Sequence, residues 1–432
     1  MSLTTVTGIR YGGRFHGMSV VGDAPVGIAG DRLSFQRYID PLIAVLTDVG
    51  QETPFTIGVF GPWGSGKSSL LRMLGEDLHA NHSDSFVLVD FNAWIHRGEA
   101  NILVPLLHTL RDALAADGQN RFIASAQKIG HVLVNLGADL LLKAVTAGGV
   151  SLENLEKLEQ QYLQRRFMVE SEMRNLRQTL KNEIDRIHDA GGTLVISVDD
   201  LDRCEPDQIV GLLDSIKLFL DLEHVFVILA VDREVIRRGI QVRYKDFKFA
   251  EGREDLIGHE YLEKMVQLPV ELFPLSDAQV EEFVESSLPG KPLETARKLV
   301  KTVALPNARK IKRLVNIFVV VRALMLADSK LKELDHLMVL RLIALQVQFP
   351  ELYWAVVRMP RALEALEKTY SRIHKQDSDY GIYTPLHEPI LALCKQYYRP
   401  EGALAKVFDG STFSDVQKQL PQYLSMLGAF NA

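Results

Sequence analysis

Hydrophobic residues in the first two-thirds of the chain follow two alternating patterns. Short unbroken apolar runs, bounded by glycine or acidic residues, are typical of strands buried on both faces of a parallel sheet. Such strands are predicted at residues 56–60, 86–90, 193–198, 225–231 and 267–272. The last one belongs at a sheet edge because Pro269 has no N–H for a ladder hydrogen bond. Apolar residues at helical spacing predict amphipathic helices at 31–49, 68–79, 99–116 and 206–221.

From residue 276 onward the pattern is helical throughout. Strands alternating with helices, followed by helices alone, predict an α/β fold: a mainly parallel five-stranded sheet flanked by helices, then an α-helical domain. We expect the first domain to span residues 1–275 and the helical domain residues 276–432. Trp94 follows the second predicted strand, where an aromatic side chain usually packs in the core, and a position near the nucleotide is the alternative.

A long polar segment at about residues 120–190 interrupts the α/β pattern and is predicted to be a helical insertion. Apolar residues in its second half are three and four positions apart, which suits a helix packed on its own domain or an intermolecular coiled coil. Residues 132–150 are long enough to span a membrane but contain Asp139 and Lys143. Each ionised group at mid-bilayer costs roughly 2.5–3.5 kcal/mol. A helix buried in protein is therefore preferred over an interfacial helix or a span, and membrane association is expected to be weak or absent.

Composition narrows the class of protein. The 432 residues are 47% hydrophobic and 24% charged, as in folded soluble proteins. A net charge of −6 gives no global positive field that would attract nucleic acid or acidic membranes, so a nucleic-acid partner is not favoured. Cys204 and Cys394 are the only cysteines, which indicates a reducing compartment and argues against structural zinc. A cytoplasmic location is expected, with peripheral attachment to the inner face of the membrane left open.

The strongest chemical signal follows the first predicted strand. Residues 61–68 read GPWGSGKS and match the pattern GxxxxGK[ST] between a strand and a helix. In such a P-loop, backbone N–H groups surround phosphate oxygens, while Lys67 reaches the β- and γ-phosphates and Ser68 ligates Mg²⁺. The expected nucleotide contacts are Gly61, Pro62, Trp63, Gly64, Ser65, Gly66, Lys67, Ser68 and Ser69.

A second signal ends the third predicted strand, where residues 194–203 read LVISVDDLDR. A carboxylate at the end of an apolar strand is what Mg²⁺ requires opposite a P-loop. We expect Asp199 to hold the metal, directly or through water, and Asp200 to orient or deprotonate the attacking water. Asp202 is the alternative for either role.

The chain order also predicts the strand order. A long stretch with a strand of its own separates Lys67 from Asp199, which favours the P-loop branch with one strand inserted between the first strand and the acidic one. Residues 225–231 would be that inserted strand. Asp232 and Arg233 would then lie between the P-loop and the acids, in the crevice where open α/β sheets bind ligands. Either residue would sense the γ-phosphate there, unless the two form an ordinary surface turn.

With these motifs, the chain resembles the KAP family of P-loop NTPases, within the additional-strand class that includes AAA+ and STAND proteins. The resemblance covers about residues 31–318. Its matching blocks are IGVFGPWGSGKSSLL (57–71), FNAW (91–94), DDLDRC (199–204), IKLFL (216–220), AVDR (230–233) and NARKIKRLVN (307–316).

The resemblance implies an ATPase whose cofactors are ATP and Mg²⁺. It also implies that Arg309 contacts the γ-phosphate, in cis or in trans, although residues 309–313 would equally suit a solvated basic face or a phosphate-backbone patch. Members of the family are typically attached to the cytoplasmic face of membranes through helices inserted between the P-loop and the acidic strand. Two clean spans are absent from that place in this sequence. Bacterial members are often linked to phage exclusion or defence within larger systems, so protein partners or self-assembly are expected.

Two functions from different classes follow. One is an ATP-hydrolysing switch that changes domain arrangement or oligomeric state. The other is a scaffold that binds nucleotide to organise a complex and barely hydrolyses it. Intact Lys67, Ser68, Asp199 and Asp200 favour the switch. A nucleic-acid motor would rest on the basic clusters at 237–248 and 309–313 alone, without a readout motif.

Overall fold

The computed structural model describes residues 20–48, 51–99, 102–116, 121–131, 174–244, 254–288, 293–374 and 402–430, with two isolated positions at 392 and 396. Residues Pro25–Phe273 form one compact unit. The described parts of Met1–Ala24 and Pro274–Ala432 form a second, helical unit. The membrane-length segment 132–150 and the first part of the apolar seam, up to residue 173, lie outside the described residues.

Residues 20–24 group with the helical unit, although the sequence predicts that the first domain spans residues 1–275. The physical reason is a pair of hydrogen bonds to α11 (Ala308–Ala327). The amide of Asn316 accepts from the Val21 N–H at 2.7 Å and donates to the Val21 carbonyl at 2.8 Å. A side-chain amide that satisfies both backbone groups of one residue holds an extended segment without a strand partner.

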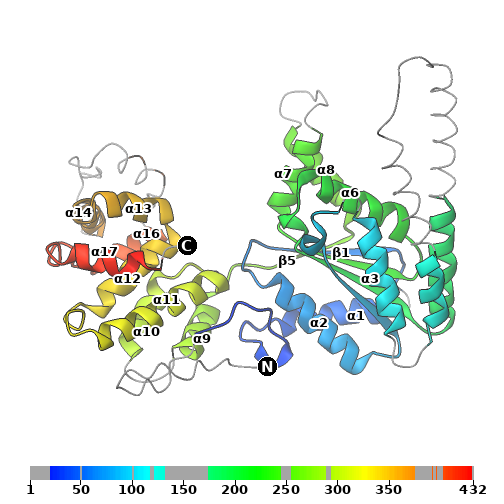
Figure 1. Ribbon diagram of the computed structural model, residues 1–432, viewed down its shortest axis with the longest axis horizontal. Helices are drawn as coiled ribbons and strands as arrows, with labels where there is room; N and C mark the ends of the chain where they lie inside the picture. The colour runs from blue at the N-terminus through cyan, green and yellow to red at the C-terminus, as the bar shows by residue number, and fades with distance from the viewer. Residues whose placement is uncertain are drawn as a thin grey trace, which may run out of the picture. The chain divides into compact units, whose positions relative to one another are not determined.

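The first unit is built on one five-stranded sheet (Figure 1). Its strands are β1 (Phe55–Phe60), β2 (Phe86–Asn92), β3 (Thr193–Asp199), β4 (Val225–Val231) and β5 (Leu268–Glu271). The order is β2-β3-β4-β1-β5, and every pair is parallel. The predicted insertion of β4 between β1 and β3 is confirmed, and so is the edge position of β5.

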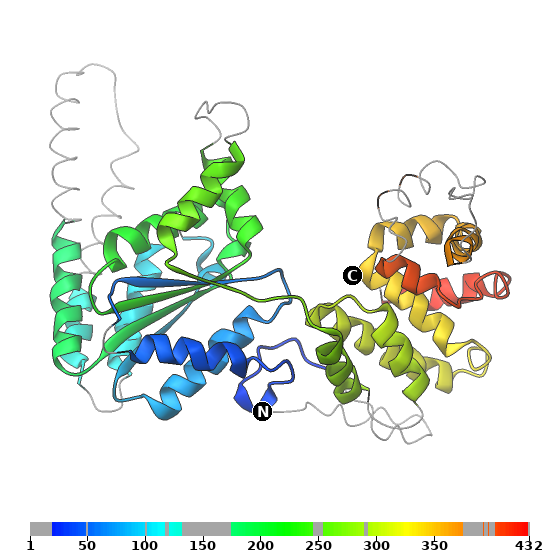
Figure 2. The same ribbon diagram turned by 180° about the vertical axis from the view of Figure 1, so that it is seen from behind.

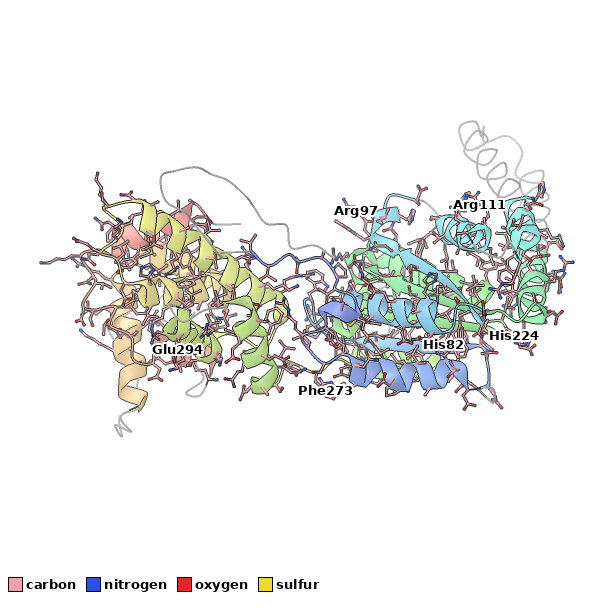
Figure 3. The ribbon with its side chains drawn as sticks, turned by 90° about the horizontal axis from the view of Figure 1, so that it is seen from below. His82, Arg97, Arg111, His224, Phe273 and Glu294 are labelled. Atoms are coloured by element: carbon pink, nitrogen blue, oxygen red, sulfur yellow. The ribbon has the colours of Figure 1, made fainter. Side chains whose placement is uncertain are left out.

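The register brings the carboxyl ends of the strands level with one another. Phe60 pairs with Val231 on one side and with Glu271 on the other. Asp199 pairs with Ala230 and with Asn92. His224 before β4 and Phe273 after β5 mark the amino and carboxyl ends of the sheet (Figure 3). Residues that follow β1, β2, β3 and β4 therefore meet at one edge.

Helices cover both faces of the sheet (Figure 2). One face carries α1 (Gln36–Thr47) and α2 (Lys67–Asn81). The other face packs against a second group of helices, together with described helices at 123–131 and 174–189. The named members of that group are α3 (Leu103–Ala115), α6 (Pro206–Ser215), α7 (Arg233–Arg243) and α8 (Glu254–Met265).

Short helical turns leave the strands at the carboxyl edge. The 3-10 turn η2 (Ala93–His96) follows β2, and η3 (Leu201–Arg203) follows β3. A third turn, η1 (Ile28–Gly30), precedes α1. The π-helix η4 (Ile216–Leu220) continues α6. None of the helices in the described parts of the chain is both long enough and apolar enough to cross a membrane.

The described end of the insertion packs on its own domain. The apolar seam of helix 174–189 is fully buried and joins the core of the first unit through Leu176, Leu180, Ile184 and Ile187. Glu183 on the same helix is buried and bonds to helix 123–131 through the Ser125 hydroxyl at 2.9 Å and the Lys128 ammonium at 3.2 Å. The two described helices that flank residues 132–173 are therefore fastened together.

The second unit is helical wherever it is described. Its helices are α9 (Asp277–Ser287), α10 (Glu294–Val303), α11 (Ala308–Ala327), α12 (His336–Gln348), α13 (Pro350–Arg358), α14 (Ala362–His374), α16 (Ala403–Phe408) and α17 (Leu420–Gly428). Helix α12 is buried along nearly its whole length, which places it at the centre of this core. Glu367 is buried and accepts the backbone N–H groups of Phe413 at 2.7 Å and Ser414 at 2.9 Å.

We expect Ile184→Ala to lower the free energy of unfolding by roughly 2–5 kcal/mol, because it opens a cavity in the core of the first unit. Urea unfolding followed by circular dichroism measures the change. Asn182→Ala, on the exposed side of the same helix, is the control and should be close to wild type. Equal stability of the two variants would show that this seam contributes nothing to the fold of its own domain.

Candidate functional site

The loop between β1 and α2 has the backbone geometry of a phosphate-binding loop. Gly64 and Gly66 have φ values of 84° and 102°, in the left-handed region that favours glycine. At Gly66 an added Cβ would also lie 2.4 Å from the Phe35 ring. Helix α2 starts at Lys67, so its unpaired N–H groups face into the loop.

Two polar groups inside this loop fit a phosphate. The Lys67 ammonium is buried and donates to the Gly61 carbonyl at 2.8 Å. The Ser65 hydroxyl is buried and has no hydrogen-bond partner among the described residues. A buried hydroxyl without a partner calls for an explanation, and an anion held by a glycine loop at a helix N-terminus supplies one. The loop therefore fits the phosphates of a nucleotide.

Asp199 and Ser68 meet across the inserted strand. The Asp199 Oδ1 atom accepts the Asp200 N–H at 2.9 Å. Burial raises the pKa of Asp199, the nearby Ser68 hydroxyl opposes that rise, and the neighbouring Asp200 charge adds to it. One carboxylate and one hydroxyl suit the oxygen preference of Mg²⁺. In the described residues no group of three or more His, Cys, Asp or Glu side chains is placed to hold a metal.

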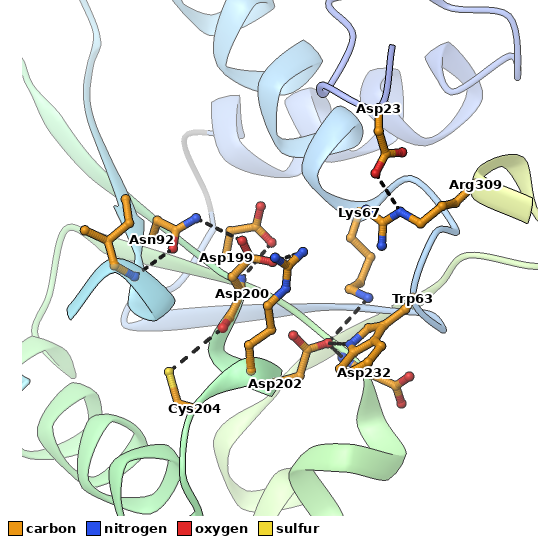
Figure 4. Close-up of polar contacts among 12 residues, drawn as sticks. Asp23, Trp63, Lys67, Asn92, Asp199, Asp200, Asp202, Cys204, Asp232 and Arg309 are labelled. Atoms are coloured by element: carbon orange, nitrogen blue, oxygen red, sulfur yellow. Dashed lines mark hydrogen bonds and ion pairs between the residues drawn. The ribbon is translucent and has the colours of Figure 1, made fainter. Parts of the chain in front are cut away.

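Asp200 is held by two neighbours at the carboxyl edge (Figure 4). It adopts a left-handed conformation, with φ 57°, that turns the chain off the sheet into η3. Its Oδ2 accepts from the Asn92 amide at 3.0 Å, and its Oδ1 pairs with the Arg203 guanidinium at 2.8 Å. Both partners lie within the matched sequence blocks at 91–94 and 199–204, but residue type and spacing alone did not single them out.

Trp94 lies on the surface, so the expectation that it packs in the core is wrong. Its exposed fraction is 39%, because η2 carries the chain away from the end of β2. The guanidinium carbons of Arg97 and Arg203 lie 4.9 Å and 5.3 Å from its ring centroid. Such cation–π contacts help to orient Arg203, and through Arg203 the ring supports Asp200.

The residues after β4 lie between the P-loop strand and the acidic strand, as the strand order requires. Asp232 caps α7, since its carboxylate accepts the Glu234 N–H at 3.0 Å. Arg233 pairs with Glu271 at 2.7 Å and lies 4.1 Å from the centroid of the Phe60 ring, at the end of β1. The structure thus gives the Asp232 carboxylate a capping bond and places a cation, Arg233, beside the strand that leads into the P-loop.

Asp202 lies closer to the P-loop than its place as the alternative candidate predicts. Its exposed fraction is only 4%, and it lies 3.6 Å from the Lys67 ammonium. Trp63, in the loop itself, donates its indole N–H to Asp202 at 3.0 Å (Figure 4). Of Asp199, Asp200 and Asp202, the last is therefore the one that forms an ion pair with the P-loop lysine in the described residues.

Arg309 belongs to the helical unit. It lies in the first turn of α11, whose cap residue Asn307 accepts the Lys310 N–H at 3.1 Å. Its guanidinium pairs with Asp23 at 2.9 Å. A contact between Arg309 and a γ-phosphate stays a prediction.

The comparison with known families agrees with this geometry. A family model described as the KAP family P-loop domain matches residues 35–325. The chain belongs to the KAP family. The match extends from α1 through the P-loop, the acidic strand and α7 into α11, so it spans both units of this KAP protein.

Two curated relatives are distant. The chain is 26% identical over 168 residues to an uncharacterized protein of Methanocaldococcus jannaschii, with 32% of this chain and 87% of that protein covered. It is 21% identical over 274 residues to a phage T7 exclusion protein of Escherichia coli strain K12, with 56% of this chain and 33% of that protein covered. The KAP chain thus spans about a third of the E. coli relative.

Because burial raises the pKa of Asp199, its ionised form costs free energy in the folded state when no metal is bound. We expect Asp199→Asn to raise the thermal unfolding temperature at pH 7 in EDTA. This advantage should shrink as the pH falls through the folded-state pKa of Asp199 towards 3.8, because the wild-type carboxyl then becomes protonated. Thermal scans between pH 5 and 8 measure the trend. Asp189→Asn, an exposed acid in the same unit, is the control, and an equal gain there would contradict the assignment.

Proposed function

We propose that this KAP-family chain binds ATP with Mg²⁺ and hydrolyses it, and that the cycle switches its conformation or assembly. The observation that carries the proposal is the P-loop with its buried Lys67, whose ammonium donates to the Gly61 carbonyl at 2.8 Å and lies 3.6 Å from Asp202, just after the acidic strand. The Ser68 hydroxyl is near enough to Asp199 to oppose the rise in its pKa, and a hydroxyl beside a strand-end carboxylate suits the metal-binding half of a P-loop site. The buried, unpartnered Ser65 hydroxyl supports the phosphate-binding half.

In this proposal each side chain has one task. The backbone N–H groups of residues 61–69, except at Pro62, which has none, and the Lys67 ammonium bind the β- and γ-phosphates. Ser68 and Asp199 hold Mg²⁺, which when bound neutralises charge on the phosphates. Asp200 orients the attacking water, and Asn92 and Arg203 fix the direction of its carboxylate. Each oxygen of a carboxylate can accept more than one hydrogen bond, so these two partners leave room for a water.

Further contacts with the γ-phosphate are proposed for a cation beyond the loop. Arg309 is one candidate, in cis or in trans, once its exposed pair with Asp23 opens. The end of β4 offers the other. There the Asp232 carboxylate caps α7 and Arg233 pairs with Glu271, so a contact of either residue with the γ-phosphate stays part of the proposal, with the cationic Arg233 the better match for an anion.

The alternative is a nucleotide-binding scaffold with little hydrolysis. One observation favours it: both oxygens of Asp200 already have partners, one of them a guanidinium. A carboxylate that is held by a guanidinium on one oxygen and by an amide on the other has fewer free lone pairs with which to orient a water. Hydrolysis would then need a step that loosens Arg203.

The cellular setting follows from similarity and composition. The printed name of the E. coli relative, a phage T7 exclusion protein, supports a role in bacterial phage defence. We propose protein partners or self-assembly as the output, a cytoplasmic location with at most weak peripheral contact with the membrane, and no nucleic-acid partner, in keeping with the net charge of −6.

Asp200→Asn should bind ATP·Mg²⁺ nearly as wild type but hydrolyse it roughly 10²–10⁴-fold more slowly, because the water loses its orienting carboxylate. Asp199→Asn should instead weaken the Mg²⁺-dependent part of binding. Calorimetry with and without Mg²⁺, followed by single-turnover hydrolysis, separates the two effects. Lys67→Ala is the control that loses phosphate affinity. If Asp200→Asn hydrolysed ATP at the wild-type rate, another group would orient the water. If the wild-type protein bound ATP·Mg²⁺ tightly but did not hydrolyse it, the scaffold would be favoured.

Light scattering after size exclusion, with and without ATP·Mg²⁺, tests the switch. A nucleotide-dependent change in mass or hydrodynamic radius is expected for wild type and should be absent in Lys67→Ala, which keeps the sheet but not the phosphate contact. A particle that does not respond to nucleotide, in a protein shown to bind it, would contradict the switch.

A further inference from the structure

A single oxygen atom joins the P-loop to the start of α7. The Oδ2 atom of Asp202 accepts the Trp63 indole N–H at 3.0 Å and the backbone N–H of Asp232 at 2.8 Å. The Lys67 ammonium lies 3.6 Å from the same atom. Figure 4 shows these three donors converging on Asp202.

Asp202 and its three donors come from the ends of three strands, of which β1 and β3 are not neighbours in the sheet. Trp63 and Lys67 follow β1, Asp202 follows β3, and Asp232 follows β4, which lies between them. The Asp202 carboxylate therefore reaches across the end of β4 to the P-loop. Its side chain is 2% exposed and that of Lys67 is 9% exposed, so the ion pair is shielded from solvent.

A buried pair of this kind makes each partner depend on the other. Removing one member leaves a buried charge without compensation, which is strongly unfavourable. Asp202 would keep only two neutral N–H donors if Lys67 moved away. Lys67 would keep the Gly61 carbonyl, which is uncharged.

Lys67 cannot serve Asp202 and a nucleotide equally well. The ammonium now donates to the Gly61 carbonyl at 2.8 Å and the Pro62 carbonyl at 3.5 Å, and it lies 3.6 Å from Asp202. An incoming phosphate carries several negative charges and competes for the same ammonium.

We infer that Asp202 is a positioning residue that acts through Lys67: it retains the ammonium in the absence of nucleotide, and a phosphate must draw Lys67 away from it. The inference rests on the proposed nucleotide binding and adds a regulatory step to it. Asp202 thereby lowers the affinity of the empty site, so that nucleotide occupancy depends on the strength of this one ion pair. Trp63 and the Asp232 N–H hold the carboxylate in place while Lys67 moves.

Asp202→Asn tests the step, because an amide oxygen can still accept from Trp63 and from the Asp232 N–H while the charge is gone. We expect the variant to bind a non-hydrolysable ATP analogue roughly tenfold more tightly than wild type, a coupling typical of residues in contact. In a Lys67→Ala background the same substitution should change affinity by less than about twofold. Calorimetry on the four proteins of this cycle gives the comparison.

The outcomes separate this inference from the proposed function. No binding by wild type would remove the proposed function itself. Binding by wild type with an unchanged or weaker affinity in Asp202→Asn would overturn the role of Asp202 alone. An equal gain in both backgrounds would also overturn it, since Asp202 would then act by simple repulsion of phosphate and not through Lys67.

If Asp202→Asn does not fold, the thermal stability of Lys67→Ala tests the inference instead. Lys67→Ala leaves the buried Asp202 carboxylate without its cation, so its thermal midpoint without nucleotide should fall by roughly 2–4 °C or more. Lys181→Ala, which breaks an exposed pair with Asp185 in the same unit, is the matched control and should change little. A Lys67→Ala midpoint equal to or above that of wild type would contradict the inference.

Discussion

The placement of β4 between β1 and β3 is the constraint on which the rest of the site depends. Neighbouring strands lie roughly 4.7–4.9 Å apart, so the P-loop strand and the acidic strand are separated by about twice that spacing. β4 is buried at every position and ends level with both neighbours. Only side chains that reach over its end connect the loop to the acids. Lys67 meets Asp202 there, and Ser68 meets Asp199.

Charge balance at this edge follows from the same geometry. Asp199, Asp200 and Asp202 lie within four positions of the chain, and their mutual repulsion would be costly without compensation. Each has a different partner: a hydroxyl for Asp199, a guanidinium and an amide for Asp200, and an ammonium for Asp202. The left-handed backbone at Asp200 turns the chain between Asp199 and Asp202, which lets the three acids take separate partners. Cys204, just beyond, is half-buried among these acids, and burial with their charges raises the pKa of its thiol to about 11.

Much of this arrangement could be predicted from residue patterns because its signals are local. The P-loop is contiguous, apolar runs mark the strands, and the chain distance between Lys67 and Asp199 indicates the inserted strand. Side-chain partners depend on turns that leave the strands, and hydrophobic periodicity carries no information about them. The bonds of Asn92 and Arg203 to Asp200, the exposure of Trp94 and the contact of Asp202 with Lys67 are of this kind. The hydrogen bond between Val21 and Asn316, 295 positions later, could not be predicted from local sequence patterns either.

The buried Glu183 has a consequence for how this architecture tolerates change. Because it fastens helix 123–131 to helix 174–189, the two points at which residues 132–173 join the described helices are fixed on the first unit. The entropy cost of closing a loop between two fixed points grows only with the logarithm of its length. A change in the number of residues between these two helices therefore costs little free energy and leaves the sheet and its P-loop in place.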